Sequence, residues 1–416
     1  MDKSLLWLWL SLHFGAGSRL YRDLIRYFDN IENIYSCDDH DMDLIAGISP
    51  TDKRKLLNKN LEHAIEVREW CEQNEVQIIT YSDVNYPSAL KKLRNFPAVL
   101  YCKGEMPNFD EELSISVVGT RSMTAYGQKM AFDLGYTLSK GGAITVSGMA
   151  RGIDSTVAIG TINALGTTVA VLGCGIDIVY PRENRTLMNK IIDYGAVITE
   201  YPPHTPPNGY HFPVRNRIIS AISNGTVVIE ASIDSGAMIT ARMALEQEKP
   251  LFALPGPARM HTSSGTNTLI KTNEAVLVRN AVEILEGFLP EFREKINFTK
   301  AKIRPTFSKG ALKIASEENN KEDLYEKSKE KKKKIRKSIR KFDEIIEETP
   351  EIVLDQAIFS PNQLKLYEVM EKGVTHHIDE LVEKTGLSAA EIAASMTMLS
   401  IEGAVEEISG GFFAKK

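Results

Sequence analysis

The feature that most constrains the fold is a regular alternation of short apolar segments with amphipathic ones. The stretches 127–141 and 235–249 have the three-to-four spacing of amphipathic helices. Strands that are apolar throughout and alternate with helices indicate a parallel sheet covered on both faces. We therefore predict an α/β fold with an extended Rossmann-like, parallel-rich sheet in residues 71–289. The expected strands read VQIIT, AVLYC, SISVVG, AITVSG, TTVAVLG, AVITE, TVVIEA, PLFALPG and AVLVRN.

The residues that follow these strands share a composition of glycines, hydroxyl side chains and, repeatedly, arginine. In an open parallel sheet, ligands bind where strands end and the next helices begin. Small residues at helix N-termini, together with arginine, suit phosphate oxygens. One such turn alone is explained more simply as a tight connection, so it is the repetition that favours an anion site. The candidates are Gly119, Thr120, Arg121, Ser147, Arg151, Arg182, Arg185, Arg215, Asn216 and Arg217.

The segment HFPVRNR, residues 211–217, is interpreted as a loop between a proline turn and a helix. Arginine carries a planar, permanently charged fork that matches phosphate. We expect Arg215 and Arg217 to join Arg121, Arg151 and Arg182 in one positive pocket that follows a phosphate chain. Two simpler interpretations stay open: Asn216 only braces the loop, and Asp154 only caps its helix or pairs with Arg151.

Familiar enzyme and nucleotide motifs do not match. Neither GTRSMTAYG nor GCGIDIV has the GxGxxG spacing of a dinucleotide site, and GxxxxGK[ST], HExxH and GxSxG are absent. His204, His211 and His261 have no evident metal partner. We therefore predict no cofactor, no metal and no catalytic residue. Single-stranded nucleic acid remains a candidate ligand, because a flexible phosphate chain suits a positive groove. The aromatic rings near the arginines would either stack on its bases or pack internally: Tyr126, Tyr180, Tyr210 and Phe212.

Charge and cysteine content bound the environment. The net charge is −5, so polyanion binding has to come from a local patch. The four cysteines form no CxxC pair, which argues against a zinc site or a disulfide framework and favours the cytoplasm. The apolar start of the chain is interpreted as a first helix in preference to a signal peptide, and no stretch approaches the ~18 apolar residues of a membrane span.

Three flanking regions are predicted. Residues 1–70 are helical, with Gly turns at 15–18 and 46–49 that outline a SAM or helix-hairpin-helix-like domain whose turn amides could hold a DNA phosphate; a helical packing domain is the simpler alternative. Residues 290–350 form a charged linker or exposed helix, whose KKKKIRKSIRK run either attracts a polyanion or is simply solvated. Residues 351–416 form a winged-helix domain. Its third helix lacks arginine, which favours a protein partner.

Several motifs closely resemble the DNA-processing protein A family (DprA, or Smf). Their order and spacing run through residues 114–271, and YPSALKKLRNFPAVLYCKG and HIDELVEKTGL resemble the family's flanks. The motifs are VVGTRSMTAYG, SGMARGID, VAVLGCGIDIVYPRENRTL, TEYPP, HFPVRNRIIS, VVIEASIDSGAMITARMALEQ, LPGP and GTNTLI.

The resemblance implies a non-enzymatic protein that binds single-stranded DNA, forms a homodimer and helps to load the RecA recombinase, protecting incoming DNA in natural transformation. It also implies DNA contacts by Arg121, by Arg182 or Arg185, and by Arg215 and Arg217. It implies DNA contacts by Gly119, Thr120 and Ser147 less directly.

The sequence departs from the family pattern at a few positions. Ala158 replaces a common histidine, KTNEAVLV replaces the Gly-Ala after LI, and His204 replaces a common glycine. None of these removes an arginine. Two alternatives remain: an enzyme acting on a nucleotide-like molecule, or a metabolite sensor that reports through the winged helix. The carboxylates available to an enzyme are Asp154, Glu200, Glu230 and Asp234.

Overall fold

The computed structural model describes residues 2–303 except 44, 46 and 47, residue 305, and parts of 360–415: 360–370, 375–388, 391–392, 395–396, 399–400, 405–408 and 412–415. The chain divides into two compact units, Met1–Leu324 and Tyr325–Lys416. The KKKKIRKSIRK run, and with it most of the predicted charged segment, lies outside the described residues.

The first unit contains one nine-stranded sheet, and every predicted strand is part of it. The strand order is β1-β2-β6-β5-β4-β3-β7-β8-β9. The seven strands of the run β6-β5-β4-β3-β7-β8-β9 are parallel to their neighbours. At the other edge, β2 pairs antiparallel with both β1 and β6. The strands are β1 (Gln77–Thr80), β2 (Val99–Gly104), β3 (Ser114–Val118), β4 (Ile144–Ser147), β5 (Thr168–Val171), β6 (Ala196–Thr199), β7 (Gly225–Val228), β8 (Leu251–Ala253) and β9 (Val276–Leu277).

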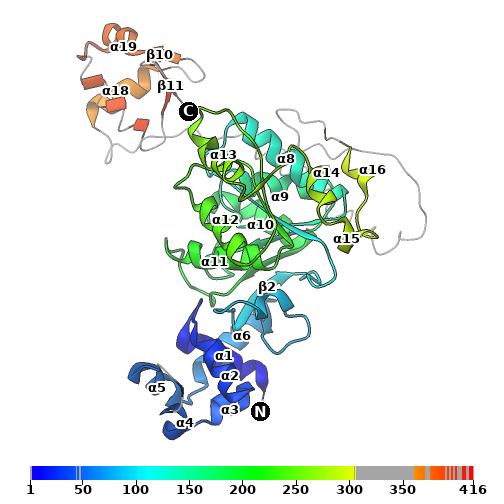
Figure 1. Cartoon of the computed structure of the whole chain (residues 1–416). Coiled ribbons are helices and arrows are strands. Elements are labelled where there is room, and N and C mark those ends of the chain that lie inside the picture. Colours follow the sequence, from blue (N-terminus) through cyan, green and yellow to red (C-terminus); the bar gives the residue numbers. More distant parts are fainter. Residues whose placement is uncertain are drawn as a thin grey trace. The chain divides into compact units, whose positions relative to one another are not determined.

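Helices cover the sheet in the manner expected for a doubly wound fold (Figure 1). Helices α8, α9 and α10 pack side by side, and α11 packs against α12. Along β3, Val117 belongs to one buried cluster and Val118 to another, because neighbouring side chains of a strand point to opposite faces. The helices that follow the first strands are α7 (Ser88–Lys91), α8 (Ala125–Lys140), α9 (Ile153–Asn163), η1 (Arg182–Asn184), α10 (Arg185–Tyr194), α11 (His211–Ala221), α12 (Gly236–Glu246), η2 (His261–Ser263), α13 (Ser264–Lys271), α14 (Ala281–Glu286), α15 (Leu289–Phe292) and α16 (Phe298–Ala301).

The N-terminal part of the first unit is helical and shares its core with the sheet. Leu6, Trp7 and Trp9 of the first helix belong to the same buried cluster as the strands β2, β5 and β6. The Trp7 indole N–H donates to the Ser82 hydroxyl (2.8 Å), which ties this helix to the segment after β1. The helices are α1 (Lys3–Phe14), α2 (Leu20–Phe28), α3 (Ile31–Ser36), α4 (Asp39–Asp43), α5 (Pro50–Leu57) and α6 (Glu62–Gln73).

The segment HFPVRNR is the main local difference from expectation. It is not a loop: α11 already begins at His211 and includes all seven residues. Pro213 is tolerated because it lies in the first turn, where a backbone N–H has no partner inside the helix. Arg215 and Arg217 are therefore two positions apart on a helix and point in directions about 200° apart.

The described part of the second unit has the winged-helix elements predicted from the sequence. Two helices, α18 (Pro361–Val369) and α19 (Ile378–Thr385), accompany a three-stranded sheet in the order β10-β12-β11. Ser360 caps α18 through a reciprocal bond pair with Gln363. Much of the predicted third helix lies outside the described residues. The strands are β10 (Thr375–His377), β11 (Val405–Ile408) and β12 (Phe412–Lys415).

Candidate nucleic-acid interface

A cleft lies at the carboxyl edge of the sheet, where the direction of winding reverses. From β3 the chain runs through β4 and β5 to β6 on one side, then crosses to β7 on the other side of β3 and continues to β8 and β9. The crevice at such a switch point is the usual ligand site of these sheets. The cleft has a volume of about 580 Å³. Its lining residues are Val118, Gly119, Thr120, Arg121, Ala150, Asp154, Tyr180, Pro207, Gly209, Phe212, Pro213, Arg215, Asn216, Ile219, Ser235, Gly236, Ala237, Ile239 and Thr240.

Three helices point their N-termini at this cleft. Asp154 of α9, Phe212 of α11 and Gly236 of α12 each lie in the first turn of their helix and line the cleft. The N-terminus of a helix carries a partial positive charge and free N–H groups. The backbone alone therefore favours an anion here.

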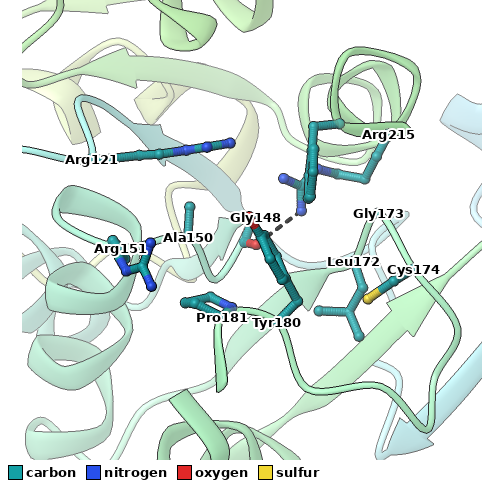
Figure 2. A pocket seen from close by; sticks show the side chains of 11 residues that line it. Arg121, Gly148, Ala150, Arg151, Leu172, Gly173, Cys174, Tyr180, Pro181 and Arg215 are labelled. Atoms are coloured by element: carbon teal, nitrogen blue, oxygen red, sulfur yellow. Dashed lines mark hydrogen bonds between the residues drawn. The ribbon is translucent and has the colours of Figure 1, made fainter. Parts of the chain in front are cut away.

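Three arginines from separate elements lie here, and two of them, Arg121 and Arg215, have no carboxylate bonded to them in the described part of the chain. A narrower pocket adjoins the cleft and is lined by Arg121 after β3, Arg151 before α9 and Arg215 of α11 (Figure 2). Arg121 is exposed and forms no ion pair among the described residues. Its guanidinium lies 5.5 Å from the centre of the Phe212 ring, and that of Arg215 lies 5.8 Å from the same ring. The ring thus supports two cations at the mouth of the pocket.

Arg215 is held in place by backbone carbonyls. It is buried, and its guanidinium donates to the carbonyl oxygens of Gly148 (2.9 Å) and Val171. Its Nε donates to Oδ1 of Asn216 (3.1 Å). A Cβ at Gly148 would come within 2.6 Å of the Arg215 guanidinium, so this close approach requires glycine. Burial lowers the pKa of Arg215 to about 10, so it remains charged at neutral pH.

Asp154 organises the connection between β4 and α9. Its carboxylate accepts hydrogen bonds from the backbone N–H groups of Gly148 (3.0 Å) and Ala150 (3.4 Å). The expectation that it caps its helix or pairs with Arg151 is therefore replaced by a role in folding the loop that carries the Arg215 acceptor. Burial raises the pKa of Asp154 to about 6, against the opposing influence of Arg215.

The remaining candidates differ in accessibility. Gly119, Thr120 and Asn216 line the cleft. Arg151 is exposed and pairs with Glu183. Ser147 is buried at the end of β4 and lines neither pocket. In the first unit's described residues, Arg182 and Arg185 are exposed on η1 and α10 without an ion pair, but outside the cleft lining.

Arg217 does not join the pocket, contrary to expectation. It is buried on the other side of α11, where its Nη2 donates to both oxygens of Glu200 (2.8 and 2.7 Å). The N–H of Gly17 also donates to Glu200 (2.9 Å). The first Gly turn of the N-terminal region thus binds an internal carboxylate. Gly17 has a φ of +75°, and a Cβ at this position would meet Val214 at 2.8 Å.

Some lining residues were missed by the sequence reasoning. The connection after β7 was recognised as a strand end, but no residue was singled out from it as an anion contact; Ser235, Gly236 and Ala237 line the cleft. The available signal was the small-residue start of α12 in SGAMIT. Ala150, which lines both the cleft and the narrower pocket, was missed for the same reason, because it carries neither a charge nor a hydroxyl.

The described residues contain no cluster of His, Cys, Asp or Glu that could hold a metal ion. Among the described helices, none combines the length and the apolar character needed to cross a membrane.

Comparisons with known proteins agree with the fold. Two family models match: DNA recombination-mediator protein A over residues 77–289, and the DprA winged helix domain over residues 356–411. Protein Smf of Escherichia coli (strain K12) is 38% identical over 219 residues, which are 52% of this chain and 58% of that protein. DNA processing protein DprA of Bacillus subtilis (strain 168) is 38% identical over 216 residues, 52% of this chain and 72% of the relative. The crystal structure of DNA processing protein A from Streptococcus pneumoniae has a TM-score of 0.59 at 26% identity, covering 69% of this chain and 98% of that one.

Proposed function

This chain belongs to the DNA recombination-mediator protein A family, and from that premise we propose that it binds single-stranded DNA in the arginine-lined cleft. The observation that carries the proposal is the convergence of Arg121, Arg151 and Arg215, from three separate elements, on one crevice. The net charge of the whole chain is −5, so this local cluster is what would attract a polyanion.

A single strand fits the chemistry of the cleft better than a free nucleotide. A flexible phosphate chain needs a positive groove with nearby rings, and this cleft has both in its arginines and in Tyr180 and Phe212. None of the triphosphate or dinucleotide motifs occurs in the sequence.

The carboxylates that an enzyme would need are largely engaged in structural bonds. Asp154 accepts from two backbone N–H groups, and Glu200 pairs with Arg217. Glu230 accepts from the backbone N–H of Thr124 (2.9 Å) and from its hydroxyl (2.6 Å). This supports a binding role in preference to turnover.

As a member of this family, the protein is proposed to act as a homodimer that hands its DNA to RecA, in natural transformation or in repair. The test is RecA loading onto an oligonucleotide coated with single-strand binding protein. We expect filament formation to be faster when the protein is added, and Arg121→Ala to reduce this effect.

DNA binding itself is tested by fluorescence anisotropy with a labelled oligo-dT at several salt concentrations. We expect Arg121→Ala to weaken binding and to flatten the salt slope by about one, since one phosphate contact is lost. The matched control is Arg279→Ala, an exposed arginine in an ion pair with Glu283 outside the cleft. Wild-type protein that fails to bind oligo-dT at low salt would refute the proposal.

A further inference from the structure

Tyr210 is an exposed aromatic side chain beside the cleft. With 69% of its surface exposed, it is the most exposed of the aromatic residues that the structure describes. It directly precedes α11, and its chain neighbour Gly209 lines the cleft, as does Phe212 two positions later. The Tyr210 hydroxyl has no hydrogen-bond partner within the described part of the chain. Neither packing nor hydrogen bonding therefore accounts for a ring at this position.

The Tyr210 ring is nevertheless linked to the core through other rings. It meets His211 edge-on, with ring centres 5.3 Å apart. His211 in turn stacks on the buried Tyr201 ring at 4.2 Å. The Tyr201 hydroxyl donates to the His211 carbonyl (3.3 Å), and the His211 imidazole lies 3.2 Å from the Gly173 carbonyl oxygen. This series of contacts connects the exposed ring to the core through His211 and Tyr201.

The other rings at the cleft are already in contact with protein groups. Phe212 packs against Tyr180 at 5.3 Å and lies under the guanidinium groups of Arg121 and Arg215. Tyr126 is 40% exposed, but its hydroxyl donates to the Pro255 carbonyl (3.0 Å) and it lines a different pocket. Tyr210 is thus the ring beside the cleft with the most open surface.

We propose that Tyr210 is a stacking platform for a base of the DNA strand whose phosphates lie in the arginine cleft. This inference rests on the proposed function and extends it with a contact to a base. Every base has a π-face, so stacking tolerates any sequence. In a duplex these faces are occupied by neighbouring bases. A platform here would therefore favour single strands without reading their sequence.

The experiment compares a labelled oligo-dT with an abasic oligonucleotide of the same length, by anisotropy at fixed salt. We expect Tyr210→Ala to weaken oligo-dT binding by about fivefold or more, the lower end of base–aromatic stacking. Binding of the abasic oligonucleotide should not change, because it has no base to stack. Tyr210→Phe should keep wild-type affinity, and the salt slope of Tyr210→Ala should match wild type because no phosphate contact is lost.

Tyr27→Ala is the matched control. Tyr27 is also an exposed tyrosine, 44% exposed, with one edge-on ring neighbour, Phe28 at 4.9 Å, but it lies on α2. We expect it to bind both oligonucleotides as wild type does. Thermal melting of each variant checks that it is folded.

The stacking role is overturned if Tyr210→Ala binds oligo-dT with wild-type affinity, if it weakens both oligonucleotides equally, or if Tyr27→Ala has the same effect. These results leave DNA binding in the cleft intact as long as Arg121→Ala still flattens the salt slope. Failure of the proposed function has a different signature: wild-type protein binds neither oligonucleotide at low salt.

Discussion

The two sides of helix α11 use the same residue type for opposite purposes. On one side, Arg215 reaches the cleft and is held by backbone carbonyls, with no carboxylate bonded to it. On the other side, Arg217 forms a two-oxygen bond with the buried Glu200. Glycine permits the close packing on both sides, through Gly148 and Gly17.

This difference shows what makes an arginine available to a ligand. A guanidinium bonded to carbonyls keeps its net charge, because carbonyl groups are neutral. The charge of a guanidinium paired with a carboxylate is neutralised, and such a group is tolerated in the core only while its partner is present. Arg215 can therefore attract an anion, whereas Arg217 balances the charge of Glu200, the carboxylate that binds the N-terminal Gly17.

The largest expected effect is on the buried side. Arg217→Ala leaves the Glu200 carboxylate buried without a balancing positive charge, which should lower the free energy of unfolding by about 3–5 kcal/mol. The measurement is urea unfolding followed by tryptophan fluorescence, since Trp7, Trp9 and Trp70 all lie on α1 and α6.

A double variant sharpens this result. Glu200→Leu with Arg217→Met replaces the ion pair by apolar groups of similar size and should recover most of the lost stability. The salt slope of DNA binding should stay at the wild-type value in the double variant. A flattened slope would mean that Arg217 also contacts phosphate.

An intermediate effect is expected on the cleft side. Arg215→Ala removes charge-assisted bonds to Gly148 and Val171 and should lower the free energy of unfolding by about 2–3 kcal/mol. Unlike the double variant, it should also flatten the salt slope of binding. Arg121→Ala provides the comparison, since an exposed arginine should affect binding with little change in stability. Equal stability of the Arg121 and Arg215 variants would contradict a structural role for the bonds of Arg215.

The last prediction concerns pH. The pKa of Asp154 is raised from 3.8 to about 6, so the folded state holds this proton more tightly than the unfolded state. Its contribution to stability is therefore present below pH 3.8 and is lost as pH rises through about 6. Between these values, the free energy of unfolding of wild type should fall relative to Asp154→Asn, whose amide oxygen can still accept from Gly148 and Ala150. Urea unfolding of both proteins from pH 4 to 8 tests this, and parallel curves would contradict it.

Much of the fold could be predicted because it depends on local patterns. Nine apolar segments form the nine strands, since alternation of strands with amphipathic helices allows few arrangements other than a parallel sheet. The position of the cleft follows too, because Gly119, Thr120 and Arg121 come directly after a central strand.

Other features depended on details that a local pattern leaves ambiguous. HFPVRNR was interpreted as a loop because proline usually interrupts a helix, yet Pro213 lies in the one turn where it is compatible. Ser147 follows the same strand-end rule as its neighbours, but its side chain is buried. Whether a side chain is accessible depends on the direction in which it points from its strand or helix, and this direction changes from one residue to the next.

The sequence by itself determined the strands, the helices between them and the set of arginines at the edge of the sheet, because each follows from the order of apolar and polar residues within a short window. Only the tertiary structure decided which arginines line the cleft and its adjoining pocket. The partner of Arg217 lies 17 residues away in Glu200, and the N–H that shares this carboxylate lies 183 residues from it, in Gly17. Folding of the chain brings these distant groups together. Whether an arginine is neutralised therefore depends on its partners in space and not on its neighbours in sequence.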